Sequence, residues 1–475
     1  MSPRVRFGLL LPALCALWRV GAAATPFEIQ RVDSLFGHGV HNSLALDSRQ
    51  DPHISYYGSG QILYASRVDT TWTIELVDSV GDVGYYTSLA IDESDAPHIS
   101  YFDLGNADLR YATKAPGYWV SEVVDSVGSV GQYGSIALDA NGTPGITYFD
   151  NTNGDLKYAT KVNGVWTIEV ADSVGLVGFY TSLTFDALGQ ACVSYLDLHG
   201  GLKFARRTAA GWMPETVDPL DNVGAYSSVA IDLSGYAHIS YLAAEALRYA
   251  RETSSGWLVE TVDSNDRAGS FTSIQLAGGT SPRISYIASA TQHLLYATRA
   301  GFGWSIEVVD SATRVDSFNS LKLDPAGNPR ISYFDTRKQS LKFADSSVHI
   351  LSPRGGELWG AGTAQKVIWA GIGPADVYLS EDGGATYTKI TSSPTTNHTV
   401  DLMVPAWSTG SARAKVVRDT PLSSSASPGL FSIAPGLTSP WWTKLVDATG
   451  FTGFTPSLTL TPGGSPRISY WDTST

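Results

Sequence analysis

Cysteine is nearly absent from this sequence, which contains two among 475 residues. Cys15 lies in an N-terminal segment that we expect to be removed, so the mature chain would keep one cysteine and could form no intrachain disulfide. That residue, Cys192, stands in a strand-like run where other copies of a repeat have His98 or His238. We therefore expect a small buried side chain rather than a nucleophile, and stability that comes from core packing.

An excess of positive charge is also lacking. Lys and Arg number 32 against 45 Asp and Glu, for a formal net charge of −13, and loss of the N-terminal segment with its three Arg would make it −16. Such a charge argues against nucleic acid and against anionic membrane surfaces as partners. An acidic surface also serves solubility, which is its simplest explanation.

Long apolar runs are missing beyond the start of the chain. Residues 1–24 combine a basic beginning at Arg4 and Arg6, an apolar core over 7–18 and small residues at 22–24. This pattern predicts a secretory signal peptide, and its core is too short to span a bilayer. We expect a secreted or cell-surface protein with no membrane span.

No catalytic or metal-binding constellation is evident. A sialidase-like hydrolase would need an arginine cluster and an acid pair that converge on one pocket, whereas Arg283 and Arg330 stand in adjacent repeat copies without a third arginine. His53, His98 and His238 share one position in different copies, so they would lie apart rather than around a zinc ion. We assign no catalytic residue, no metal and no cofactor.

What the sequence does contain is a repeat with a spacing of 45–47 residues, and such a period is typical of propellers and other repeat architectures. The recurring Trp is Trp72, Trp119, Trp166, Trp212, Trp257 and Trp304, with Phe27 in the first copy. The recurring Asp is Asp33, Asp78, Asp125, Asp172, Asp218, Asp263 and Asp310. The recurring Ser is Ser43, Ser88, Ser135, Ser182, Ser228, Ser273 and Ser320. Recurrence in every copy indicates structural roles.

Each copy holds four strand-like runs, which in the second copy are 72–78, 88–92, 98–103 and 109–113, separated by turn residues. Four strands with a period near 46 residues predict an all-β fold, a seven-bladed β-propeller, with eight blades as the alternative. The long link after the first run places that run outermost and the second run innermost. Residues 27–33 would then complete the last blade and close the ring.

A charge pattern accompanies the repeat. Five copies have Lys or Arg after the fourth run and Glu in the run that follows, which predicts a cross-strand pair within one blade. At the proposed closure both positions are neutral, as Ser346 and Gln30. The basic residues are Lys114, Lys161, Arg206 or Arg207, Arg251 and Arg299, and the acidic ones are Glu122, Glu169, Glu215, Glu260 and Glu307.

The composition divides the chain into a signal peptide (1–24), a propeller (25–348), a Ser/Thr/Pro-rich module (349–435) and a partial repeat (436–475). The string SPRGGELWGAGTAQKVIW, followed by VYLSEDGGATYTKI, resembles the Ig-like domain of yeast cell-wall synthesis proteins. This resemblance implies a β-sandwich that serves as a surface spacer or adhesion module.

Within the module, Ser380-x-Asp382-x-Gly384-x-Thr386-Tyr387 matches the Asp-box of sialidase-like propellers, a hairpin element. The Ig-like resemblance covers this module only, and the repeats resemble those of secreted bacterial β-propeller proteins of the sialidase-like class.

The partial repeat resumes the pattern with Trp441, Asp447 and Ser457, and the sequence ends before a fourth run. It predicts an incomplete eighth blade or the start of a second propeller. A truncated gene product would explain the ending, and so would a natural end at which another segment supplies the missing strand.

Candidate binding residues fall at two repeat positions. The first residue of the third run varies between copies, and its polar forms His53, His98, His238, Arg283 and Arg330 are candidates for ligand contact. Aromatic residues precede the recurring Ser, and they could stack on sugar rings or pack between blades: Tyr85, Tyr86, Tyr133, Tyr180, Tyr226, Phe271 and Phe318.

The leading functional hypothesis is non-catalytic binding or adhesion outside the cell, to a glycan or protein, through a propeller face or its axial channel, by a monomer. The alternatives are a sialidase-like glycoside hydrolase and a structural spacer, because the fold alone does not choose among them.

Overall fold

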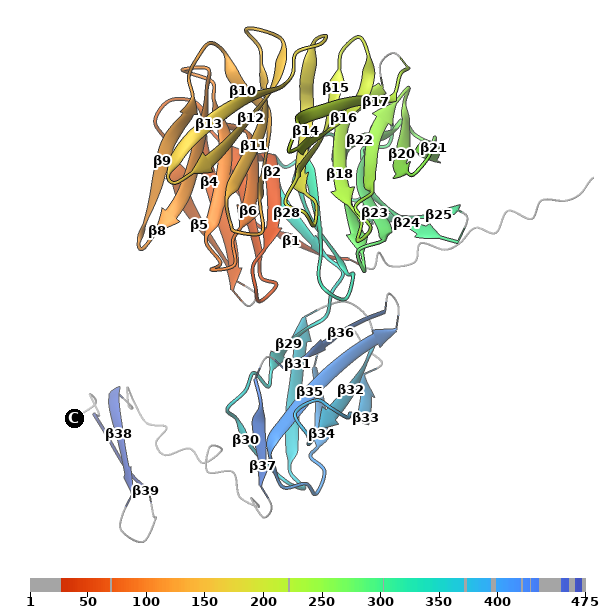
Figure 1. The fold of residues 1–475 in the computed structure, drawn as a ribbon. Coiled ribbons are helices and arrows are strands. Elements are labelled where there is room, and N and C mark those ends of the chain that lie inside the picture. The colour runs from red at the N-terminus through yellow and green to blue at the C-terminus, as the bar shows by residue number, and fades with distance from the viewer. Residues whose placement is uncertain are drawn as a thin grey trace, which may run out of the picture. The chain divides into compact units, whose positions relative to one another are not determined.

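The computed structural model describes residues 27–434, apart from 69–70, 221–222, 302, 371–373, 394–398, 420–421 and 428, together with strands 454–460 and 466–471. The proposed signal peptide, Trp441 and Asp447 lie outside these residues. The described residues form strands and turns without any helix (Figure 1), which confirms the all-β prediction. Accordingly, this part of the chain has no helix suited to crossing a membrane.

The described residues divide into two compact units, with the main division between Ser347 and Val348. The first unit contains seven antiparallel four-stranded sheets. Sheet 1 comprises β2 (His38–Leu46), β3 (Pro52–Gly58), β4 (Gln61–Val68) and β5 (Thr71–Asp78). Sheet 2 comprises β6 (Val83–Ile91), β7 (Pro97–Asp103), β8 (Asp108–Ala115) and β9 (Tyr118–Asp125). Sheet 3 comprises β10 (Val130–Leu138), β11 (Pro144–Asp150), β12 (Asp155–Val162) and β13 (Val165–Asp172).

The remaining four sheets repeat this plan. Sheet 4 comprises β14 (Val177–Phe185), β15 (Ala191–Asp197), β16 (Gly201–Thr208) and β17 (Gly211–Asp218). Sheet 5 comprises β18 (Val223–Ile231), β19 (Ala237–Ala243), β20 (Ala246–Thr253) and β21 (Gly256–Asp263). Sheet 6 comprises β22 (Ala268–Ala277), β23 (Ser281–Ala288), β24 (His293–Ala300) and β25 (Gly303–Asp310). Sheet 7 comprises β26 (Asn319–Leu323), β27 (Pro329–Asp335), β28 (Ser340–Asp345) and β1 (Glu28–Arg31).

The N-terminal strand closes the first unit. In sheets 1 to 6 the strands pair in chain order, whereas β1 pairs with β28 from Glu28↔Asp345 to Arg31↔Lys342. The first strand of each sheet packs against the first strand of the next, and β2 packs against β26. Both predictions hold: the run after the long link is the inner strand, and the N-terminal run completes the last sheet. The fold is a propeller of four-stranded sheets.

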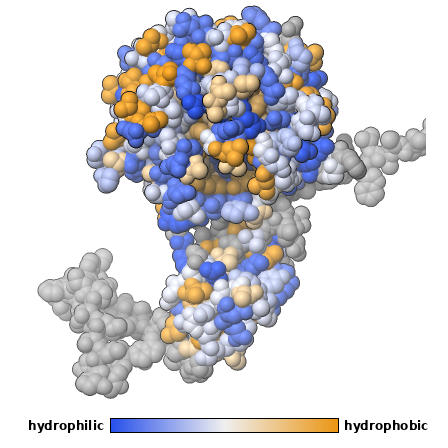
Figure 2. All heavy atoms as spheres, in the orientation of Figure 1, coloured by the Kyte–Doolittle hydropathy of each residue, from blue (hydrophilic) through white to orange (hydrophobic). Residues whose placement is uncertain are grey.

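The core lies between adjacent sheets rather than inside one. In one representative cluster, Ile62 and Tyr64 of sheet 1 pack with Leu89, Ile99 and Tyr101 of sheet 2, all buried. Neighbouring sheets thus bury each other's faces, which is why a single repeat could not fold alone. Apolar side chains also gather on the outer side of this unit in Figure 2, and Val123 and Val170 on two outer strands are about half exposed.

Glycine permits the close approach of each inner strand to the preceding sheet. Gly84 has φ of 109°, and a Cβ there would lie 3.1 Å from the Cα of Ile62. Equivalent glycines occur in the inner strands of sheets 1 to 6, but the seventh copy has Asp316 at this place. Its inner strand β26 is correspondingly short and starts at Asn319, because a side chain cannot enter that contact.

In the second unit, two sheets surround one core. The smaller sheet is β29 (His349–Ser352), β31 (Ala364–Ala370) and β34 (Thr399–Met403). The larger is β30 (Leu358–Gly360), β37 (Phe431–Ala434), β35 (Thr409–Asp419), β32 (Ala375–Ser380), β33 (Thr388–Ser393) and β36 (Leu422–Ala426). Val367 and Trp369 from the smaller sheet share a core with Val377 and Phe431 from the larger.

The Asp-box forms the turn between β32 and β33. The Ser380 hydroxyl accepts a hydrogen bond from the Gly384 amide at 2.8 Å, and Asp382 accepts bonds from the Thr386 amide and hydroxyl at 2.9 and 2.6 Å. The Ser380 hydroxyl also donates to Asp382 at 2.7 Å, and this bond, followed by the two from Thr386, lowers the pKa of the Asp382 carboxyl. All of these contacts are local, as the prediction of a hairpin element requires.

A last hairpin is formed by β38 (Phe454–Leu460) and β39 (Pro466–Trp471). Its register pairs Ser457 with Ser469 and Leu458 with Ile468. The same positions are paired in sheet 2, where Ser88 faces Ser100. The backbone pairing of this segment is therefore that of the first two strands of a repeat.

Candidate binding site on the propeller axis

Three layers of contacts join each sheet to the next, and they explain the recurring residues. In the innermost layer, each recurring Ser accepts a hydrogen bond from a backbone amide of the following sheet. The seven bonds have lengths of 3.0–3.1 Å, and they run in a closed circle from Ser43 to Leu89 around to Ser320 and Leu44. We call these seven residues the serine ring.

In the middle layer, a buried Tyr of each sheet donates to the recurring Asp of the preceding sheet. The distances are 2.6–2.8 Å in all seven cases, for example 2.7 Å from the Tyr101 hydroxyl to Asp78. The other oxygen of Asp78 accepts the Val80 amide at 3.0 Å and so holds the following turn. Burial raises the pKa of the Tyr101 hydroxyl, so it remains a donor.

In the outer layer, the recurring Trp reaches the preceding sheet. The indole of Trp119 packs on Tyr64 with ring centroids 5.0 Å apart, and its Nε1 donates to Glu75 at 3.1 Å. Lys114 binds the same carboxylate at 2.6 Å. Trp72, Trp166, Trp212, Trp257 and Trp304 make the corresponding ring contacts.

The predicted cross-strand pair within one sheet is therefore wrong. The register places Lys114 opposite Trp119, three residues from Glu122, so its ammonium group reaches Glu75 across the gap between sheets. Gln30 correspondingly accepts from Arg67 and Trp72 of sheet 1, at 3.4 and 3.2 Å. Gln30 and Ser346 thus lie at two different junctions, and their joint neutrality is not the loss of one pair.

Next to the serine ring, one residue in each sheet adopts an unusual backbone conformation. His41, Tyr86, Tyr133, Tyr180, Tyr226, Phe271 and Phe318 all have φ of 50–55°. In sheets 1 to 6 these residues fall within an irregular stretch of the inner-strand register. A left-handed conformation at a bulky residue is a true outlier, and each instance costs roughly 1–3 kcal/mol. We call this set the aromatic collar.

The collar side chains form a closed circle. Each ring contacts the next with centroids 4.1–4.8 Å apart, from His41–Tyr86 around to Phe318–His41. Burial lowers the pKa of His41 to about 3, so its imidazole is neutral at physiological pH. Burial also raises the pKa of Tyr86 and Tyr180, which keeps their hydroxyls protonated.

Polar residues that follow the collar hold its backbone. Thr181 donates to the Tyr133 carbonyl at 2.7 Å, Ser227 to the Tyr180 carbonyl at 3.1 Å, and Thr272 to the Tyr226 carbonyl at 3.0 Å. Asn42 and Asn319 donate the equivalent bonds to the carbonyls of Phe318 and Phe271 in the preceding sheets. Bonds from a neighbouring sheet can maintain a strained conformation that the local chain would not choose.

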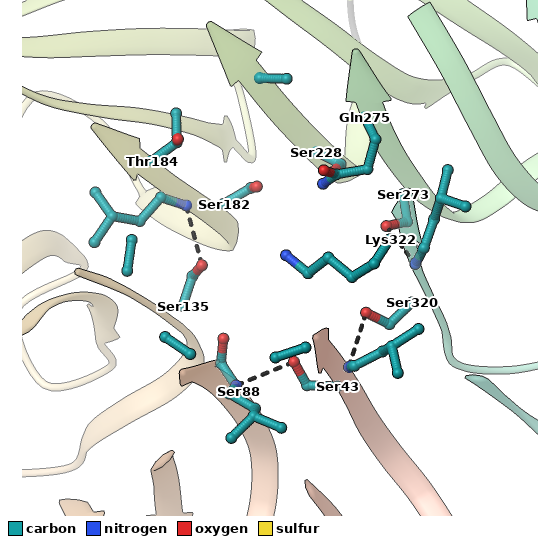
Figure 3. A pocket seen from close by; sticks show the side chains of 18 of the residues that line it. Ser43, Ser88, Ser135, Ser182, Thr184, Ser228, Ser273, Gln275, Ser320 and Lys322 are labelled. Atoms are coloured by element: carbon teal, nitrogen blue, oxygen red, sulfur yellow. Dashed lines mark hydrogen bonds between the residues drawn. The ribbon is translucent and has the colours of Figure 1, made fainter. Parts of the chain in front are cut away.

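Two cavities lie at these rings. The first, of about 180 Å³, is lined by the collar and by the residues that follow it, among them Asn42, Thr87 and Asn319. The second, of about 640 Å³, is lined by the seven inner strands and includes the serine ring. We call the second cavity the axial channel. Figure 3 shows Lys322 pointing into its middle, with Gln275 and Thr184 also at its wall.

The structure does not bring the predicted His residues together. His53, His98 and His238 lie in sheets 1, 2 and 5, each bonded to a Tyr hydroxyl of the adjacent strand through Nδ1. Each lies 3.3–3.4 Å, through Nε2, from an Asp that also holds a turn. Burial lowers their pKa values.

Arg330 is 1% exposed and bonds the Gln50 carbonyl, while Arg283 bonds Ser281 at 3.1 Å. The polar atoms of these five candidates bond to separate sets of nearby residues and do not converge on one cavity. No group of three or more His, Cys, Asp or Glu within the described ranges could hold a metal ion.

Sequence reasoning singled out six collar members but missed His41. His41 could have been found from its position, because it lies two residues before Ser43, as Tyr86 lies two residues before Ser88. Lys322 was also missed; it stands two residues after Ser320, where other copies have Ala, Thr184 or Gln275. Cys192 is buried as predicted, and burial raises the pKa of its thiol to about 12.

Comparison with known proteins gives no family for this chain: no family model and no curated protein matches it. Among solved structures, AofleA from Arthrobotrys oligospora is 14% identical, with 60% of this chain and 89% of that chain covered and a TM-score of 0.42. The SapL1 lectin in complex with alpha-methyl fucoside is 14% identical, with 59% and 99% covered and a TM-score of 0.42. A lectin from Aleuria aurantia, described as a six-bladed β-propeller with a novel mode of fucose recognition, is 15% identical, with 61% and 98% covered and a TM-score of 0.40. Likeness at this level decides neither the number of sheets nor a ligand, so the fold of this chain rests on its own strand pairing.

Proposed function

We propose that this protein is a non-catalytic binding protein that acts outside the cell and recognises a carbohydrate group at the aromatic collar. In this proposal the seven sheets are the blades of one seven-bladed propeller, and the second unit is an Ig-like sandwich that presents or spaces it. The partner is an extracellular glycan bound by a monomer.

The observation that carries the proposal is the repeated strain of the collar. Seven bulky residues share a backbone conformation that glycine would adopt without cost, and neighbouring sheets supply the bonds that hold them there. Strain of this kind clusters at binding sites, where the surrounding structure fixes a side chain for a purpose. If the bulge had a structural role alone, glycine would form it at a lower conformational cost.

The chemistry of the collar suits a sugar. Aromatic rings offer faces and edges for the C–H groups of a sugar ring, and hydroxyl and amide groups fix orientation. Tyr86, Tyr133, Tyr180 and Tyr226 supply consecutive phenols, and Asn42 and Asn319 lie on the same wall. The cavity of about 180 Å³ suits one ring-sized group better than an extended chain.

The hydrolase alternative has less support. Glycoside hydrolysis in its usual form needs two carboxyl groups that flank the scissile bond. The described lining of the collar cavity and of the axial channel contains no Asp and no Glu. The spacer alternative assigns no role to the strained collar.

The test uses the chain from residue 25 onward in a glycan-array screen, with turnover assays on aryl glycosides. We expect binding of some glycan without turnover, and loss of that binding in Tyr133→Ala. Tyr118→Ala is the matched control, because Tyr118 is 62% exposed on an outer strand and its loss should leave binding unchanged. Turnover would favour the hydrolase, and silence in both assays would favour the spacer.

Tyr133→Gly adds a second readout. Relief of the left-handed conformation should return about 1–2 kcal/mol, which offsets part of the lost ring contacts, each worth about 0.5–1.5 kcal/mol. We therefore expect this variant to lose glycan binding, and its free energy of unfolding to fall by less than about 3 kcal/mol. A loss of 3–5 kcal/mol, as for an ordinary core aromatic, would mean that the collar is a structural element.

A further inference from the structure

The axial channel holds one cation that the fold does not require. Lys322 lies on β26 opposite Arg330, and its side-chain ammonium group has no hydrogen bond or ion pair with a described residue. Six equivalent positions carry Ala, Thr184 or Gln275, so the same architecture forms without a charge there. Burial lowers the pKa of Lys322, with no acidic group to oppose the effect. The Lys322 side chain is partly exposed in the channel, and a bound anion would give its ammonium group a charge partner.

The serine ring offers the channel a second set of groups. Each of its hydroxyl oxygens already accepts a backbone amide, as described above, and none of the seven donates to a described protein atom. A serine hydroxyl has one hydrogen to donate, so these hydrogens remain for whatever occupies the channel. Figure 3 shows the hydroxyls around the space that Lys322 enters. The lining is thus rich in donors and, within its described residues, contains no carboxylate.

We propose that the axial channel is a second binding site, distinct from the collar, for a small hydroxylated anion of the sugar-acid class. The anionic group binds the Lys322 ammonium as a charge-assisted pair. The hydroxyl groups accept from the serine ring and bond the amide of Gln275. The channel volume of about 640 Å³ accommodates such a molecule with water around it.

The experiment measures binding of glucuronate, glucose and inorganic phosphate to the full chain by isothermal titration calorimetry. Glucuronate and glucose present similar hydroxyl groups and differ in the charge, while phosphate offers charge without the sugar ring. We expect glucuronate to bind at least tenfold more tightly than either of the others. Equal affinity for glucose would overturn the role of the charge, and equal affinity for phosphate would overturn the role of the serine ring.

Variants locate the site. Lys322→Gln should weaken glucuronate binding at least tenfold, and Lys322→Arg should keep most of it. Gln fits this position because Gln275 already occupies it in sheet 6, and a thermal melt verifies the fold. Lys338→Gln, in an exposed turn, removes the same charge elsewhere and should change nothing.

Unchanged affinity in Lys322→Gln, or no measurable binding of glucuronate to the wild type, would overturn the proposal. Tyr133→Ala should retain glucuronate binding in the channel, which separates this site from the collar.

Discussion

Apart from its shorter inner strand, the junction between sheets 6 and 7 differs from the regular junctions in its outermost layer. The serine bond and the tyrosine–aspartate bond are present there as elsewhere, through Leu321 and Tyr333. In the outer layer Phe27 replaces the recurring Trp, and Ser346 stands where Lys114 does in sheet 2. Closure by a separate strand therefore preserves the two inner layers and gives up the outer polar contacts.

The carboxylates at the two kinds of junction show the consequence. At the junction of sheets 3 and 4, Glu169 accepts from Arg207 at 2.6 Å and from Trp212 at 3.2 Å, and the bonds from Arg207 hold its pKa below the usual value. At the junction of sheets 6 and 7, burial raises the pKa of Glu307, with Arg283 opposing. The comparison teaches that apolar packing and the inner layers suffice to close the ring.

The largest expected effect tests that packing. Phe27 is 1% exposed and packs on Tyr296 with ring centroids 6.1 Å apart, so Phe27→Ala should lower the free energy of unfolding by about 3–5 kcal/mol. Trp166→Ala, at a regular junction where the indole is only half-buried, should cost less. Denaturant unfolding measures both, and a smaller loss for Phe27→Ala would contradict the idea that the closing junction depends on apolar contact.

The second effect tests the middle layer, which should be equivalent at both kinds of junction. Tyr333→Phe and Tyr148→Phe each remove a hydroxyl that donates to a buried Asp, at 2.6 and 2.7 Å. We expect each to lose about 1–3 kcal/mol, because one donor to a buried carboxylate disappears. The two losses should agree within about 0.5 kcal/mol. Disagreement beyond that margin would show that the middle layer changes at the closure too.

The sequence predicted more of the recurring contacts between sheets than of the candidate binding site at the aromatic collar. The period identifies equivalent positions, so Trp119, Asp78 and Ser88 could be assigned structural roles and the strand order followed from link length. The period does not reveal which neighbour a side chain meets across the gap between sheets, and Lys114 was therefore paired with the wrong Glu. Nor does the period reveal backbone conformation. The residue types of Tyr86 and His41 do not indicate a positive φ, which occurs where the register of the inner strand is irregular.

The third effect is a dependence on pH with opposite signs at the two junctions. Because the folded pKa of Glu307 lies above its unfolded value, its contribution to stability is full below the unfolded pKa and is lost as pH rises through the folded pKa. Glu169 has the reverse behaviour: its contribution is present above the unfolded pKa and is lost as pH falls through the folded pKa.

Glu307→Gln should accordingly raise stability at pH 7 by up to about 0.5 kcal/mol, and Glu169→Gln should lower it by about 0.5–1 kcal/mol. Both differences from the wild type should shrink as the pH falls from 7 to 3.5, because protonation removes the charge of each carboxyl group. Thermal melts at the two pH values provide the measurement. A destabilising Glu307→Gln at pH 7 would show that this carboxylate has a favourable partner after all.

The smallest effect concerns the other side of the closing sheet, where Gln30 stands in place of Glu75 and its equivalents. Gln30→Glu would restore a carboxylate for Arg67 and Trp72, which now bond the Gln30 amide oxygen. Arg67 already pairs with the buried Asp345 at 3.2 Å. A carboxylate at position 30 would be attracted to Arg67 and repelled by Asp345, so the two effects oppose each other. The change in the free energy of unfolding should therefore stay within about 0.5 kcal/mol. A gain above 1 kcal/mol would mean that the neutral residue is a cost of closing the ring rather than a match to Asp345.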